Sequence, residues 1–126
     1  MAKVTGIGGV FFKARDPKTL SQWYRENLGL EVQPWGGAVL RWGTPENLSG
    51  TTAWSLFSAD TSHFAPSAAP FMVNYRVDDL AGLLATLRER GCEIVAGPEA
   101  SEYGKFAWLL DPEGNKVELW EPPVGK

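Results

Sequence analysis

The residues with the clearest capacity for chemistry are one carboxylate and the aromatic side chains around it. Glu118 and Trp120 are two positions apart, so in a β-strand both side chains lie on one face. The segment before them, Asp-Pro-Glu-Gly-Asn at 111–115, consists of turn-forming residues and predicts a tight hairpin. Antiparallel pairing across this turn places Trp108 opposite Glu118 and Phe106 opposite Trp120. The sequence therefore predicts a carboxylate among aromatic rings.

Two interpretations of Glu118 are open from the sequence. In the first, Glu118 acts on a ligand, either as a general base or as a hydrogen-bond anchor, and it is then the candidate catalytic residue. In the second, it is an inert partner of Arg76 or Arg41 across the site.

The face that carries Glu118 also gathers side chains that suit a small-molecule pocket. Alternation over 71–77 places the even-numbered side chains of that strand on this face. Aromatic rings there suit a flat or cationic ligand, although the same rings could simply be sheet core. The segment 101–105 is predicted to be a mobile edge over the site, from which Tyr103 could close on a ligand. The predicted ligand-binding residues are Phe11, Arg41, Trp54, Met72, Asn74, Arg76, Tyr103, Phe106, Trp108 and Trp120.

Two helices are predicted to support these strands. Asp16 followed by Pro17 is typical of an N-cap and a first helical residue, and Gly29 is typical of a helix end. The second helix is predicted to begin at 78–79 and to end at Gly91. Each helix has one apolar stripe, so each should cover one face of a sheet. Strands are predicted at 71–77, at roughly 31–35, 38–42 and 52–58, and at roughly 92–96, 103–110 and 116–120.

The sequence contains a degenerate internal repeat. A shift of 63 residues aligns Val10 with Val73 and Asp16 with Asp79. The repeat predicts an α+β fold made of tandem βαβββ modules, which are too small to be independent domains. The predicted organisation is a single domain over 1–126, with module one at about 4–58, a linker at about 59–70 and module two at about 71–121.

The composition is that of a globular chain and argues against several classes of partner. The 126 residues carry a net charge of −3, and no basic run suggests nucleic-acid binding. No window approaches the length of a membrane span. The single cysteine, Cys92, fits a reducing cytoplasm and is predicted to be a packed core thiol. We therefore expect a cytoplasmic protein.

The motifs of this chain resemble the vicinal oxygen chelate superfamily, which includes glyoxalase I, bleomycin-resistance proteins and extradiol dioxygenases. The likeness runs over roughly 5–121. It rests on Trp-Tyr-Arg-Glu-Asn-Leu-Gly-Leu at 23–30 and on Leu-Asp-Pro-Glu-Gly-Asn-Lys-Val-Glu-Leu at 110–119. The resemblance implies curved mixed sheets that enclose a cup, usually completed in a homodimer. It also implies that catalytic members hold a divalent metal in the cup.

This sequence departs from the metal-binding pattern that the resemblance implies. Gly9 and Met72 stand where histidine ligands are implied, and 51–58 has no carboxylate, amide or imidazole. Because only Glu118 is retained, we expect no cofactor, with Glu118 as a ligand if a metal does bind. His63 is the one histidine of the chain, and in the predicted linker we expect it to be solvated or packed in a loop.

Two functions of different classes fit these residues. The first is a metal-free binding protein that holds a small aromatic or amphipathic molecule in the cup, similar to bleomycin-resistance proteins. The alternative is a metal-dependent lyase or isomerase of the glyoxalase type, with Glu118 among its metal ligands. The expected partners are a small-molecule ligand and a second copy of the chain. The modules could pair within one chain or swap across the dimer, since the linker length permits either.

Overall fold

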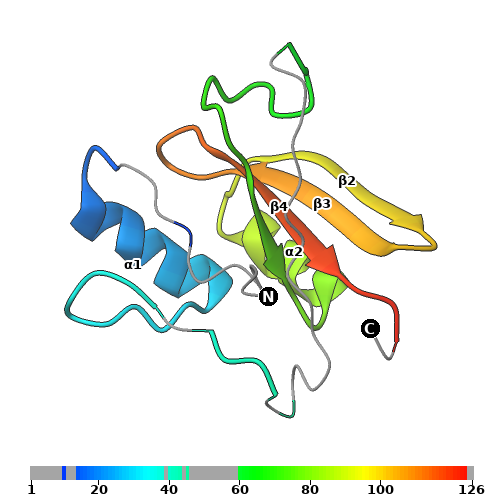
Figure 1. Cartoon of the computed structure of the whole chain (residues 1–126), viewed down its shortest axis with the longest axis horizontal. Helices are drawn as coiled ribbons and strands as arrows, with labels where there is room; N and C mark the ends of the chain where they lie inside the picture. The colour runs from blue at the N-terminus through cyan, green and yellow to red at the C-terminus, as the bar shows by residue number, and fades with distance from the viewer. Residues whose placement is uncertain (1–9, 11–13, 39, 44, 46–59, 125–126) are drawn as a thin grey trace, which may run out of the picture.

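The computed structural model describes residues 10, 14–38, 40–43, 45 and 60–124, which form two helices and a four-stranded sheet (Figure 1). The elements in chain order are α1 (Pro17–Leu28), β1 (Val73–Arg76), α2 (Leu80–Glu89), β2 (Ile94–Ser101), β3 (Gly104–Leu110) and β4 (Lys116–Glu121). The sheet order is β1-β4-β3-β2, in which β1 is parallel to β4 and the other neighbours are antiparallel. The predicted α+β class with a mixed sheet is confirmed.

Both helices begin where the predicted caps place them. The Asp16 carboxylate accepts a hydrogen bond from the Thr19 amide at 3.1 Å, and Gly29 ends α1 in the left-handed conformation with φ of 66°. The Asp79 carboxylate likewise accepts from the Gly82 amide at 3.1 Å at the start of α2. Each cap satisfies an amide that has no partner inside the helix, which stabilises the helix by about 1 kcal/mol.

The hydrophobic core lies between the helices and one face of the sheet. Leu109, Val117 and Leu119 have at most 1% of their surface exposed, so the face opposite Glu118 packs under the helices, as alternation predicts. In Figure 1, α2 crosses behind the strands and α1 lies beside them. The helical residues that fill this core are Leu20, Tyr24, Leu80, Leu84 and Leu87. Cys92 is half-buried against the core, and burial raises the pKa of its thiol.

The turn between β3 and β4 is held by one buried carboxylate. Asp111 is 4% exposed and accepts hydrogen bonds of 2.9 Å from the amides of Glu113 and Asn115, from the Asn115 side chain and from the Tyr24 hydroxyl. The ring of Tyr24 packs on Tyr75 with the centroids 5.8 Å apart. Because Tyr24 belongs to α1, this network fixes the hairpin against the helix layer.

The prediction of strands directly after α1, at 31–35 and 38–42, is wrong for the described residues. Neither 31–35 nor the described part of 38–42 contains a strand. Instead, the amide of Gln33 donates to the carbonyl of Gly37 at 2.8 Å and closes a turn. A proline and two glycines lie in this segment and favour a turn over extended pairing.

The strand predicted at 92–96 is longer in the structure, because β2 continues to Ser101. Two register irregularities between Ile94 and Glu99 let the strand pass Gly97 and Pro98. A proline is tolerated here because β2 is at the edge of the sheet. Gly97 is required by close packing, since a Cβ atom there would lie 2.8 Å from the Cα atom of Ala107.

Several predicted elements lie outside the described residues. These are the strand at 52–58, most of the first strand implied by the βαβββ pattern of module one, and the candidate ligand-binding residues Phe11 and Trp54. In the part of the chain that the structure describes, no helix has the length and apolarity to cross a membrane.

Candidate functional site

The register of three strands brings the candidate site together. Parallel pairing of β1 with β4 sets Asn74 beside Glu118, and antiparallel pairing of β4 with β3 sets Trp108 on the other side of Glu118. In the next row on this face, Trp120 lies between its pairing partners on β1 and β3, Arg76 and Phe106. The predicted pairs across the hairpin are therefore confirmed.

Both oxygens of the Glu118 carboxylate have hydrogen-bond donors. Oε1 accepts from Nδ2 of Asn74 at 2.7 Å, and Oε2 accepts from Nε1 of Trp108 at 2.8 Å. Nε2 of His63 lies 3.6 Å from Oε2, within the range of an ion pair if the imidazole is protonated. The Glu118 side chain is only 14% exposed, so these contacts are partly shielded from water. Glu118 is thus held in one orientation by neighbours on two strands and a loop.

The arginines predicted as possible partners of Glu118 lie elsewhere. The guanidinium of Arg76 lies over the ring of Trp120, with its central carbon 5.7 Å from the ring centroid. The reason is the register, since Asn74 and not Arg76 is opposite Glu118. Arg41 is exposed in a loop, where a strand facing the site was expected.

The structure places His63 at the site, which the sequence analysis missed. Its imidazole meets the Trp108 ring edge-on, with centroids 6.1 Å apart and an interplanar angle of 86°. The Lys116 ammonium donates to the His63 carbonyl at 2.5 Å and so ties the loop to β4. The side chain of His63 is 39% exposed, so it is the more accessible member of the pair with Glu118. The sequence offered one weak signal, which is that this lone histidine precedes β1 closely.

Three aromatic rings continue the site along the sheet, and we call them the aromatic ladder: Trp108, Phe106 and Trp120. Trp108 and Phe106 are 6.2 Å apart at 13°, and Phe106 and Trp120 are 6.3 Å apart at 21°. Phe106 and Trp120 are half-buried, whereas Trp108 is 8% exposed. The ladder therefore offers an apolar surface that begins at the carboxylate and becomes more accessible away from it.

The remaining predicted ligand-binding residues lie around this face or at its end. Met72 is half-buried and immediately precedes β1. Tyr103 is 67% exposed, in the turn that joins β2 to β3, so the segment 101–105 is a hairpin end. The Tyr103 carbonyl accepts from Nε1 of Trp120 at 2.8 Å, which fixes the indole of the ladder.

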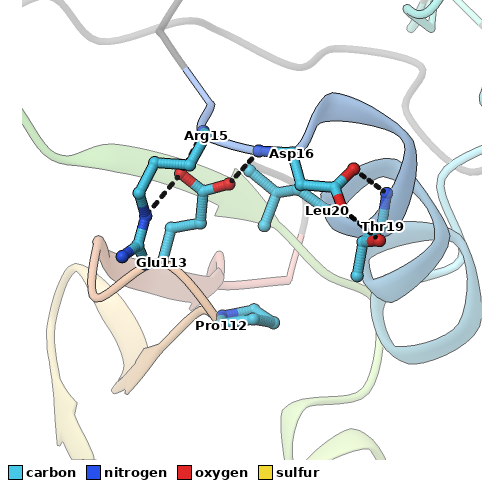
Figure 2. A pocket seen from close by; sticks show the side chains of 6 residues that line it. All are labelled: Arg15, Asp16, Thr19, Leu20, Pro112 and Glu113. Atoms are coloured by element: carbon cyan, nitrogen blue, oxygen red, sulfur yellow. Dashed lines mark hydrogen bonds and ion pairs between the residues drawn. The ribbon is translucent and has the colours of Figure 1, made fainter.

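A shallow hollow of about 270 Å³ lies away from Glu118, between the start of α1 and the β3–β4 turn (Figure 2). Figure 2 shows the Glu113 carboxylate between Arg15 and Asp16. It accepts from the amide of Arg15 at 2.6 Å and from the amide of Asp16 at 3.0 Å, and these bonds lower the pKa of Glu113. The amides of Arg15 and Asp16 are thus already paired with Glu113, so we interpret the hollow as a structural junction between the two halves of the chain.

Comparison with known proteins identifies the family. Residues 9–120 match the model of the glyoxalase-like domain. The chain belongs to the glyoxalase-like domain family. This membership confirms the resemblance to the vicinal oxygen chelate superfamily. A comparison with curated proteins found no match.

Solved structures with the same fold support this assignment. TnmS3, an antibiotic binding protein from Streptomyces sp. CB03234, has a TM-score of 0.61 and 19% identity, over 98% of this chain and 100% of its own. A protein from the mobile metagenome of V. Pseudocholerae has a TM-score of 0.59 and 18% identity, over 94% and 95%. The oxidase ChaP-H2 has a TM-score of 0.56 and 22% identity, over 90% of both chains. At these identities, the likeness shows the fold.

The described residues of this glyoxalase-like domain do not fit a metal centre of the superfamily. Within them, no group of three or more His, Cys, Asp or Glu side chains could hold an ion together. Among the described residues, His63 is the one other side chain of that kind that contacts Glu118. The indole N–H of Trp108 donates and cannot ligate, and it is directed at the Oε2 atom that a metal would need.

Proposed function

We propose that this glyoxalase-like protein binds a small, flat aromatic or amphipathic molecule on the aromatic ladder beside Glu118, without a metal. The observation that carries the proposal is the continuous surface of Phe106 and Trp120, which ends at a fixed carboxylate. Half-buried rings of this kind gain apolar burial when a ligand covers them, at roughly 25 cal/mol per Å². One fixed polar group at the end of the surface then sets the orientation of the ligand.

The geometry of Glu118 favours an anchor over a general base. Its two oxygens already accept hydrogen bonds from Asn74 and Trp108, which hold the carboxylate in one orientation. A group that orients a ligand works best when it is held in position before the ligand binds. Glu118 still has acceptor capacity for a donor on a ligand, because a carboxylate offers about four lone-pair sites.

A structural neighbour is consistent with binding as the function. TnmS3 is an antibiotic binding protein, and it covers nearly the whole of this chain with the same fold. The oxidase ChaP-H2 shares the fold as well, so the fold alone does not choose between binding and catalysis. The preference for binding over catalysis comes from the residues at the site.

The oligomeric state and the cellular compartment are proposed from the family likeness and from the cysteine content. We infer a homodimer in the cytoplasm, because the superfamily usually completes its cup in a dimer and the single thiol of Cys92 suits a reducing compartment. Light scattering after size-exclusion chromatography tests the dimer, and a mass of one chain at micromolar concentration would contradict it.

The binding proposal is tested by a panel of aromatic compounds against matched variants. Ligands are detected by saturation-transfer NMR, which does not depend on tryptophan fluorescence. Phe106→Ala should weaken binding about tenfold or more, because stacking on an aromatic ring contributes roughly 1 kcal/mol beyond area burial. Trp35→Ala is the control, since Trp35 is an aromatic residue 69% exposed in the turn after α1. Equal binding by the Phe106 and Trp35 variants, or no ligand in the whole panel, would contradict the proposal.

A further inference from the structure

The side chain of His63 lies at the end of the ladder where Trp108 meets Glu118. The His63 imidazole is a flat nitrogen heterocycle that meets Trp108 edge-on and directs Nε2 toward Oε2 of Glu118 at 3.6 Å. It reaches this position from the segment 60–67, which precedes β1 and is the loop at the top of Figure 1. His63 therefore covers the two most shielded residues of the site.

We propose that His63 is an internal stand-in for the ligand, and that the site selects flat nitrogen heterocycles whose N–H replaces His63 on Glu118. This inference rests on the proposed function and names the ligand class for it. A ring nitrogen and a flat ring are what Glu118 and Trp108 already have beside them, so the position of His63 indicates the group that the site recognises. Phe106, the next ring of the ladder, lies 6.2 Å from Trp108 and offers apolar surface to a ligand with a fused second ring.

Several polar contacts of the segment 60–67 lie within the segment itself. The His63 amide donates to Oγ1 of Thr61 at 3.1 Å, and the Ala65 amide donates to the Ser62 carbonyl at 3.0 Å. Among the described residues, His63 contacts the sheet through its carbonyl at Lys116 and through its imidazole at Glu118 and Trp108. The opening of a surface loop costs less free energy than global unfolding, so a ligand can displace the imidazole while the sheet stays folded.

The 3.6 Å separation also favours exchange of the imidazole for a ligand. It is longer than a hydrogen bond between nitrogen and oxygen, which lies near 2.9 Å, so His63 gives Glu118 a weaker contact than a closely placed donor would. A ligand N–H at hydrogen-bond distance from Oε2 therefore binds this oxygen more tightly than His63 does. Such a bond to a charged acceptor corresponds to about ten- to hundredfold in affinity.

The test uses benzimidazole, which has a flat fused ring and one N–H, and 1-methylbenzimidazole, which has the same ring without that N–H. Dissociation constants are measured by NMR for the wild-type chain and for His63→Ala. We expect His63→Ala to bind benzimidazole about tenfold more tightly than wild type, because the internal competitor is gone. We also expect 1-methylbenzimidazole to bind about tenfold more weakly than benzimidazole. In His63→Ala/Glu118→Gln the two compounds should bind equally.

A second variant keeps the test decisive if His63→Ala folds poorly. Lys116→Met removes the hydrogen bond to the His63 carbonyl but keeps the imidazole, and it should also raise the affinity for benzimidazole. No gain in either variant, or equal binding of the two compounds, would overturn the inference. If aromatic ligands still depend on Phe106 in that case, the proposed function stands and only the internal stand-in is wrong. If they do not depend on Phe106, the proposed function fails on its own test.

Discussion

Replacing Asp111 by asparagine should destabilise the protein, because the β3–β4 turn is held by this buried carboxylate. The carboxylate is 4% exposed and accepts four hydrogen bonds, two at each oxygen. An asparagine keeps one oxygen for the amides of Glu113 and Asn115, but its NH₂ group then faces the Asn115 side chain and the Tyr24 hydroxyl. Two bonds to a charged acceptor are lost, at roughly 1.5 kcal/mol each. We expect a loss of about 3 kcal/mol in the free energy of unfolding.

Urea and thermal unfolding, followed by circular dichroism, measure this loss. For a chain of this length, 3 kcal/mol corresponds to a fall in Tm of roughly 10 °C. Tyr24→Phe removes one of the four donors and should cost about 1 kcal/mol, and the double variant should cost less than the sum because both changes remove the same bond. Asp78→Asn is the charge-matched control, since Asp78 is exposed, and it should stay within about 0.5 kcal/mol of wild type. A change within about 0.5 kcal/mol for Asp111→Asn would refute this account of the turn.

Three further predictions concern the core and the pH range of stability. Leu84→Ala, at a residue 1% exposed, should cost about 2–5 kcal/mol in urea unfolding, whereas Leu40→Ala, at a residue 68% exposed, should cost less than about 0.5. Hydrogen bonds lower the pKa of Glu113 from its ordinary 4.5, so their contribution to folding stability is present above pH 4.5 and is lost as the pH falls below it. Glu113→Gln should therefore flatten the fall in stability at acid pH, and an unchanged fall would contradict the assignment. Because burial raises the pKa of Tyr24 from its ordinary 10.0, stability should fall as the pH rises above 10.0; the fall should be shallower in Tyr24→Phe, and equal slopes would argue against this origin.

Local signals in the sequence predicted the supporting elements of the site well. The caps at Asp16 and Asp79 act through their own side chains on amides three residues away, so their effect can be read from the sequence. The pairing of Trp108 with Glu118 follows from a turn that fixes the register and from the two-residue period of a strand. These features depend on neighbours along the chain.

The contacts that define the chemistry of Glu118 could be predicted only in part. Asn74 was placed on the correct face, but its position opposite Glu118 depends on a parallel pairing between segments 44 residues apart. The proximity of His63 depends on the path of a loop, and no periodic pattern records it. The turn at 33–37 was missed because its apolar residues resemble those of a short strand.

The most direct test of the central claim follows the indole N–H resonances of the six tryptophans while an aromatic ligand from the panel is titrated into labelled protein. Binding on the ladder beside Glu118 predicts shifts at Trp108 and Trp120, whose N–H groups donate to Glu118 and to the Tyr103 carbonyl. The exposed Trp35 should not shift in the same titration. Shifts at Trp35 with none at Trp108 or Trp120 would contradict the claim that this face is the binding site.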